Sequence, residues 1–171
     1  STGLITGTPT AVGPATFKVA AFTNLAAAVK DITVDVVDLD AWQYSMELTV
    51  NYSGGSNLVG FPTNFKLSEA KAPGFKYSQV ASANGRDLRF TDEAGGTLLP
   101  YQTDEWKPGG ESRIWVKVPV VGNPTTKINM LWGNPDEASA FPAYVTNGST
   151  WSEYAGRWSM DDETGNKLLD S

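Results

Sequence analysis

Residues 112–120 read Ser-Arg-Ile-Trp-Val-Lys-Val-Pro-Val, and this stretch decides the fold class. Successive side chains of a β-strand point to opposite faces, so the β-branched residues at the even positions 114 to 120 share one face. The odd positions carry Trp115 between Arg113 and Lys117. This alternation predicts an antiparallel strand with one face toward a core and the other toward solvent.

Seven more stretches are rich in apolar residues at strand spacing, and turns of Gly, Pro, Asn or Asp bound them. They are residues 15–21, 32–36, 44–52, 61–68, 87–91, 98–103 and 126–132. Short strands with no helical period between them predict an all-β protein, an antiparallel β-sandwich of jelly-roll type. The predicted core consists of Met46, Leu48, Val50, Leu67, Phe90, Ile114, Val116, Val118, Ile128 and Met130.

The chain has neither histidine nor cysteine among its 171 residues. This composition excludes Ser-His-Asp and Cys-His catalysis and Cys/His zinc sites, and no isolated Asp/Glu pair suggests glycoside hydrolysis. We therefore expect a non-catalytic domain with no cofactor and no metal. The adjacent acids Asp161-Asp162-Glu163 alternate between the faces of a strand and lack the spacing of a calcium-binding loop.

The charge and hydropathy of the chain limit the kinds of partner that we expect for it. The net charge is −6 and the pI is about 4.6, which disfavours nucleic acid because a phosphate backbone requires a basic surface. No apolar run approaches the roughly 20 residues that span a bilayer, and no signal peptide is visible from Ser1 onward. We therefore expect no insertion of this segment into a membrane.

Five short motifs follow one another between Tyr44 and Asn134. They read Asp-Leu-Arg-Phe-Thr-Asp at 87–92, Leu-Pro-Tyr at 99–101, Asp-Glu-Trp at 104–106, Ile-Trp-Val-Lys-Val-Pro at 114–119 and Met-Leu-Trp-Gly-Asn at 130–134. In this order and spacing they resemble a bacterial family catalogued as domain of unknown function 2341. The resemblance implies a module of a large cell-surface protein, placed beside Ig-like repeats and laminin-G or concanavalin-like domains.

The flanks of this region agree with such a setting. Residues 1–38 look like the C-terminal strands of a bacterial Ig-like domain, and residues 158–171 are similar to the opening strand of a concanavalin-like domain. We therefore expect the β-sandwich domain itself at residues 39–157. Both ends of the chain are expected to be parts of neighbouring domains.

Trp115 is the first candidate for ligand binding. If the apolar face of its strand is core, the indole is displayed beside the cations Arg113 and Lys117. A flat indole stacks on the C–H face of a sugar ring, while neighbouring polar groups orient the hydroxyls. The alternative is that both faces of the strand are covered and Trp115 is simply packed. The first hypothesis predicts that Trp115→Ala weakens binding by about 1–3 kcal/mol and leaves thermal stability nearly unchanged.

A second candidate lies where a predicted strand runs into a glycine-containing loop. Tyr101, Gln102, Asp104 and Trp106 stand there, and acid, amide and aromatic groups together are common in glycan contacts. The alternative is that Trp106 caps the end of the sandwich while the carboxylates are merely solvated.

Asp87 and Arg89 stand two residues apart, on one face of the predicted strand 87–91. They are flanked by the expected core residues Leu88 and Phe90. We expect an ion pair that braces the sheet, and the alternative is a ligand contact.

These observations favour a non-catalytic recognition or adhesion module of a large extracellular or cell-surface protein. Glycan is the ligand class that its aromatic, amide and carboxylate chemistry fits best, so the expected partner is a polysaccharide or a neighbouring surface protein. The alternative is a structural role, as a spacer or assembly unit of a surface layer, stalk or filament. In that role the strands within residues 1–38 would complete a neighbour's sheet.

Overall fold

The computed structural model describes residue 11 and residues 13–22, 27–122 and 124–157. The chain divides into two compact units, Ser1–Ala41 and Trp42–Ser171. Every strand predicted from the sequence is present, with shifted ends, so the all-β prediction is confirmed. The Ig-like and concanavalin-like identities of the two flanks remain predictions, and residues 158–171 lie outside the described residues.

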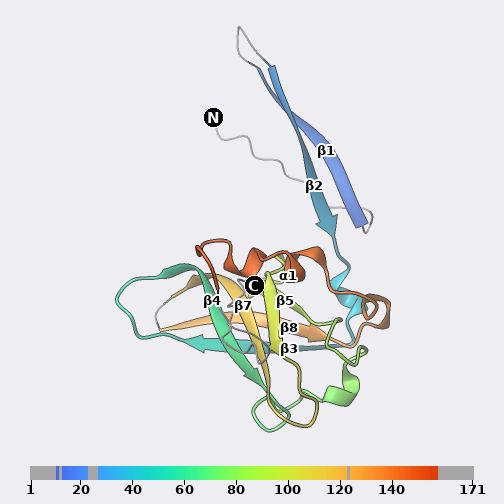
Figure 1. The fold of residues 1–171 in the computed structure, drawn as a ribbon, viewed down its shortest axis with the longest axis vertical. Helices are drawn as coiled ribbons and strands as arrows, with labels where there is room; N and C mark the ends of the chain where they lie inside the picture. Colours follow the sequence, from blue (N-terminus) through green and yellow to red (C-terminus); the bar gives the residue numbers. More distant parts are fainter. Residues whose placement is uncertain (1–10, 12, 23–26, 123, 158–171) are drawn as a thin grey trace, which may run out of the picture. The chain divides into compact units, whose positions relative to one another are not determined.

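The strands of the first unit form a β-hairpin. Strand β1 (Gly13–Phe22) pairs antiparallel with β2 (Ala27–Val36) over the whole length of both (Figure 1). A short 3-10 turn, η1 (Leu39–Ala41), follows the second strand.

One face of the hairpin is mainly apolar, and the other mixes polar residues with the exposed side chains of Phe22 and Val29. On the mixed face, Lys18 Nζ lies 2.7 Å from Asp31 Oδ1. On the apolar face Phe17 is the cross-strand partner of Ile32, and Ile32 and Val34 are 37% and 47% exposed. The predicted alternation is therefore present, but within the described part of this unit the apolar face is not buried.

The second unit is an antiparallel β-sandwich, as predicted. One sheet has the strand order β3–β8–β5 and the other has the order β4–β7–β6 (Figure 1). The strands span Tyr44–Asn51 (β3), Leu58–Leu67 (β4), Arg89–Asp92 (β5), Tyr101–Glu105 (β6), Ser112–Val121 (β7) and Thr125–Trp132 (β8). Short helical turns in the connections span Tyr77–Gln79 (η2), Pro135–Glu137 (η3), Ala143–Thr146 (α1) and Ser149–Trp151 (η4).

The core lies between the two sheets. Most residues predicted for it are buried, namely Leu67, Phe90, Ile114, Val116, Val118, Ile128 and Met130. The predicted core residues of β3 are only partly buried: Met46, Leu48 and Val50. All three lie on β3, an outer strand of its sheet.

Val120 departs from the inward face that the sequence predicted. It is 44% exposed, whereas Val121 is buried. Its partner on β4 is Val59, and the next residue, Gly60, has a φ of +61°. The inward phase of residues 114–118 therefore does not continue to Val120, which pairs next to this left-handed position of β4.

Candidate functional site

Trp115 lies on the outer face of β7, on the side away from the core, in the phase that the sequence predicted. It is not an exposed platform, because its indole packs against Trp151 with ring centroids 5.2 Å apart and planes at 60°. Its Nε1 atom is buried and has no hydrogen-bond partner among the described residues. The predicted exposure of Trp115 is therefore wrong, since a later stretch of the same chain, residues 149–157, returns to this face.

We call residues 149–157 the covering segment. Lys117, a predicted ligand contact, holds it: Lys117 Nζ donates to Ser152 Oγ at 2.6 Å and to Glu153 Oε1 at 3.1 Å. These contacts leave the Lys117 side chain only 17% exposed. Its ammonium group is thus already engaged within the chain.

Asp104 and Gln102 hold the rest of the covering segment. Asp104, another predicted ligand contact, pairs with Arg157, whose guanidinium carbon lies 5.1 Å from the centre of the Trp151 ring. Trp151 Nε1 donates a hydrogen bond to Gln102 Oε1. The polar groups predicted to orient a ligand therefore bind the chain's own indole and guanidinium.

Arg113 and Tyr101, two further predicted contacts, lie on opposite sides of the sheet. Arg113 is half exposed, and its Nη1 atom lies 3.6 Å from Glu105 Oε2. Tyr101 is completely buried and donates from its hydroxyl to the carbonyl oxygen of Leu88 at 2.8 Å. Burial raises the pKa of the Tyr101 phenol. The structure corrects the prediction for Tyr101, because its side chain points into the core and a ligand on the surface does not reach it.

Trp106 packs at one end of the sandwich. Its Nε1 atom donates to the carbonyl oxygen of Ala83 at 2.8 Å, and its ring meets Tyr77 edge to face at 5.2 Å. Gly85 lies so close that an added Cβ would stand 2.9 Å from the Trp106 ring. This geometry corresponds to the alternative in which Trp106 caps the fold.

Asp87 and Arg89 are both buried, but no ion pair joins them. The Asp87 carboxylate accepts hydrogen bonds from the backbone N–H groups of Ala81, Ser82 and Gly133. Arg89 donates to the carbonyl oxygens of Arg86 and Leu88 and pairs with Glu137. The expected pair is replaced by separate contacts, because the loop before β5 and the turn after β8 supply partners for both side chains.

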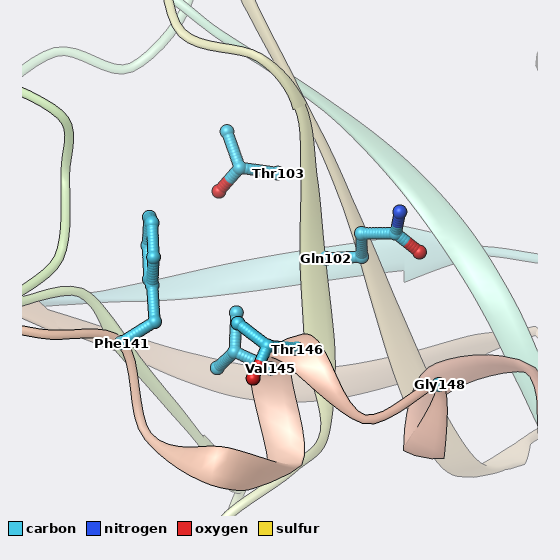
Figure 2. Close-up of a pocket in the computed structure, with 6 residues that line it drawn as sticks. All are labelled: Gln102, Thr103, Phe141, Val145, Thr146 and Gly148. Carbon is cyan, nitrogen blue, oxygen red and sulfur yellow. The ribbon is translucent and has the colours of Figure 1, made fainter. Parts of the chain in front are cut away.

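A pocket of about 280 Å³ lies beside β6, an outer strand of its sheet. We call it the β6 pocket, and the residues that line it are Gln102, Thr103, Phe141, Val145, Thr146 and Gly148. Figure 2 shows the hydroxyl of Thr103 turned toward Phe141, on the side of β6 where α1 lies. The amide of Gln102 points to the other side of the strand. None of the lining side chains is charged.

A second pocket, of about 340 Å³, has two carboxylates in its wall. Glu69 lies 3.0 Å from Lys76 Nζ, and Glu111 lies 2.5 Å from Lys71 Nζ. The hydrogen bonds from Lys76 and Lys71 lower the pKa values of Glu69 and Glu111. Both groups are therefore ionised at neutral pH, whereas the general acid of a glycosidase requires a raised pKa.

Across the described ranges, no group of three or more His, Cys, Asp or Glu side chains could hold a metal ion. The acidic run Asp161-Asp162-Glu163, which the sequence had disfavoured as a calcium site, lies outside those ranges. No helix in the part of the chain that the structure describes is long and apolar enough to cross a bilayer.

Sequence reasoning missed the residues that build the β6 pocket and cover Trp115. They are Thr103, Phe141, Val145, Thr146, Gly148, Trp151 and Arg157. One signal was available, since residues 141–157 hold several large aromatics with no strand period to bury them. Local periodicity cannot say where such a segment docks, because its partners lie on β6 and β7.

Comparisons with known proteins agree with the resemblance seen in the sequence. A search of the curated proteins and a search of the solved structures each gave no match. A family model described as "Domain of unknown function (DUF2341)" matches residues 84–152. Residues 84–152, which include Trp115 and the whole lining of the β6 pocket, therefore belong to the DUF2341 family.

Proposed function

We propose that residues 42–157 form a non-catalytic recognition or adhesion module of an extracellular or cell-surface protein, and that its ligand is a glycan. The observation that carries this proposal is a row of aromatic rings on the outer face of the β4–β7–β6 sheet. Trp151 packs against both Trp115 and Tyr154, at centroid distances of 5.2 and 6.0 Å. We call these side chains the aromatic row. The surface setting is the one that the family resemblance implies.

The row reaches the surface at Tyr154, which is 45% exposed. Aromatic faces bind the C–H faces of sugars, and polar groups beside them orient the hydroxyls. The side chain of the neighbouring Glu153 is 64% exposed, and its carboxylate accepts hydrogen bonds. In this proposal Tyr154, and not Trp115, is the exposed ring on which the sugar stacks. Trp115 lies beneath the row and packs against Trp151.

Two features support a function without catalysis. The chain has no histidine or cysteine, so general acid–base or nucleophilic chemistry would depend on carboxylates, lysines or hydroxyls. The carboxylates that line a pocket, Glu69 and Glu111, are ion-paired and have lowered pKa values. Both properties suit a solvated salt bridge and do not suit a proton donor.

The proposal predicts that Tyr154→Ala weakens glycan binding by about tenfold or more, which corresponds to about 1.4 kcal/mol. The physical reason is the loss of the exposed ring on which the sugar stacks. A glycan array identifies the ligand, and titration followed by tryptophan fluorescence measures the dissociation constant, since Trp151 contacts Tyr154.

A matched control is Val59→Ala, because Val59 is 78% exposed on a strand of the same sheet but is not in the aromatic row. This variant should bind as the parent chain does. Equal losses in the two variants, or binding unaffected by Tyr154→Ala, would place the glycan elsewhere. An array with no bound glycan would count against the proposed function itself.

The alternative function is a structural unit of a layer, stalk or filament. A specific observation favours it: the hairpin carries an apolar face on which Ile32 and Val34 are 37% and 47% exposed. An isolated two-stranded hairpin is only marginally stable in water, and apolar faces of this kind are usually covered by a partner. A second copy of the chain, presenting the same face, is the occupant that this alternative requires.

Self-association of the chain distinguishes the structural role from glycan recognition. Sedimentation velocity over a range of protein concentrations should then show a monomer that becomes a dimer or larger assembly. Val34→Glu should abolish the association, because a charge on the apolar face would be buried without a partner. Thr33→Glu, on the opposite face of the same strand, is the matched control. A chain that stays monomeric throughout rules the second copy out.

A further inference from the structure

The walls of the β6 pocket carry no charge. Its volume of about 280 Å³ lies just below the range for small-molecule sites, about 300–1,000 Å³, so it suits one ring and not an extended chain. Phe141 supplies an aromatic face, and Thr103 and Thr146 supply hydroxyl groups. Figure 2 shows these side chains around one space on the α1 side of β6.

Two buried hydroxyl oxygens at this corner have no hydrogen-bond partner among the described residues. They are Thr103 Oγ1 in the pocket wall and Thr150 Oγ1, two residues beyond the lining residue Gly148. Buried polar atoms of native proteins bond to protein, to water or to a ligand. A pocket wall with a polar atom in need of a partner fits a ligand rich in hydroxyl groups.

We propose that the β6 pocket binds one neutral sugar ring, an inference that rests on the proposed recognition of a glycan. Gln102 connects the pocket with the aromatic row, because it lines the pocket and its amide oxygen accepts from Trp151 Nε1. One ring of a glycan occupies the pocket, and a neighbouring part of the same glycan reaches Tyr154.

Charge excludes an acidic ring from this proposal. The chain has a net charge of −6, and neither lysine nor arginine lines the pocket. A carboxylate or sulfate placed there would lose its hydration without gaining a cation. A neutral ring loses only hydroxyl hydration, which the threonine hydroxyls and the backbone of β6 replace.

An extended peptide is the other ligand that an outer strand attracts, since such a strand presents unpaired backbone groups. Here α1 packs against β6, and its residue Val145 is part of the hydrophobic core. A peptide strand added to β6 would have to displace α1. The pocket therefore suits a compact ligand better than a strand.

The test uses the full chain and methyl glycosides of neutral hexoses as probes, with methyl glycosides of hexuronic acids for comparison. Amide shifts in isotope-labelled protein should change at Thr103, Thr146 and Gly148 with the neutral probes. Thr146→Arg should weaken this binding by about tenfold or more, because the exposed Thr146 stands in the pocket wall. Phe141→Leu, which keeps an apolar side chain and removes the ring, should weaken it in the same direction.

Tyr154→Ala separates this inference from the proposed function. It should leave the single-ring probes unaffected and weaken an oligosaccharide found on the array. Shifts confined to residues 151–154, or hexuronic acids bound as well as neutral hexoses, would overturn the assignment of the pocket while glycan recognition stands. Neutral probes bound in the pocket with no oligosaccharide bound on the array would keep the pocket and remove the proposed glycan function.

Discussion

Replacing Asp87 by alanine should lower the free energy of unfolding by about 3 kcal/mol or more, the largest effect that we expect from a single polar side chain here. The carboxylate is completely buried and accepts from three backbone N–H groups, those of Ala81, Ser82 and Gly133. Alanine would leave these donors buried without an acceptor. Chemical denaturation of the full chain, with urea or guanidinium, measures the change.

The hydrogen bond to the Asp87 carboxylate explains why a glycine, Gly133, follows β8. Its φ is +88°, and an added Cβ would lie 2.6 Å from the Tyr44 ring, so a larger residue would be strained there. This turn brings the Gly133 N–H within 2.8 Å of the Asp87 carboxylate. Asp87 therefore joins the end of β8 to the loop before β5, which makes the expected loss large.

Asp92→Ala is the matched control, because its carboxylate also accepts from backbone N–H groups, those of Gly96 and Thr97. Burial raises the pKa of Asp92, but hydrogen bonds from Thr97, Gly96 and Gly95 outweigh it, and the net pKa is lowered. A lowered folded-state pKa means that the stabilisation is present at neutral pH and is lost on acidification through that pKa. Since water reaches this turn, the cost should stay under about 1 kcal/mol. Equal costs for the two variants would contradict a dry environment around Asp87.

Trp115→Ala should lower the free energy of unfolding by about 2–3 kcal/mol, less than the about 3–5 kcal/mol of a fully buried tryptophan. The indole is half-buried against Trp151, and its Nε1 atom has no partner to lose. The cost therefore comes from lost packing and from loosening of the covering segment. Denaturation measures it, and Val59→Ala, at a position 78% exposed, should change stability by less than about 0.5 kcal/mol.

A double-mutant cycle makes the Trp115 prediction sharper. Trp151→Ala should cost a similar amount, and the double variant should cost less than the sum, because each substitution removes the same ring contact. Additive losses would mean that the two rings are energetically independent. Unchanged stability together with lost glycan binding would restore the exposed platform that the strand phase predicts.

The strands and the sandwich could be predicted from the sequence because their signal is local. Alternation in residues 112–120 fixes which side chains of β7 share a face, and the β7 and β8 core positions followed directly. The predicted core of β3 was less accurate, because burial also depends on which segments cover a strand, and alternation does not encode them. The prediction for Val120 was wrong because the regular alternation of β7 ends after Val118, opposite the left-handed Gly60 of β4.

The sequence by itself determined the fold class, the inward face of β7 over residues 114–118, and a composition without histidine or cysteine. Only the tertiary structure decided that Trp115 is covered, that Tyr101 is core, and that Asp87 and Arg89 bind separate partners. A period of two says which residues share a face, because it reflects backbone geometry. What covers that face depends on segments distant in the chain, here residues 149–157, and no local pattern encodes their docking.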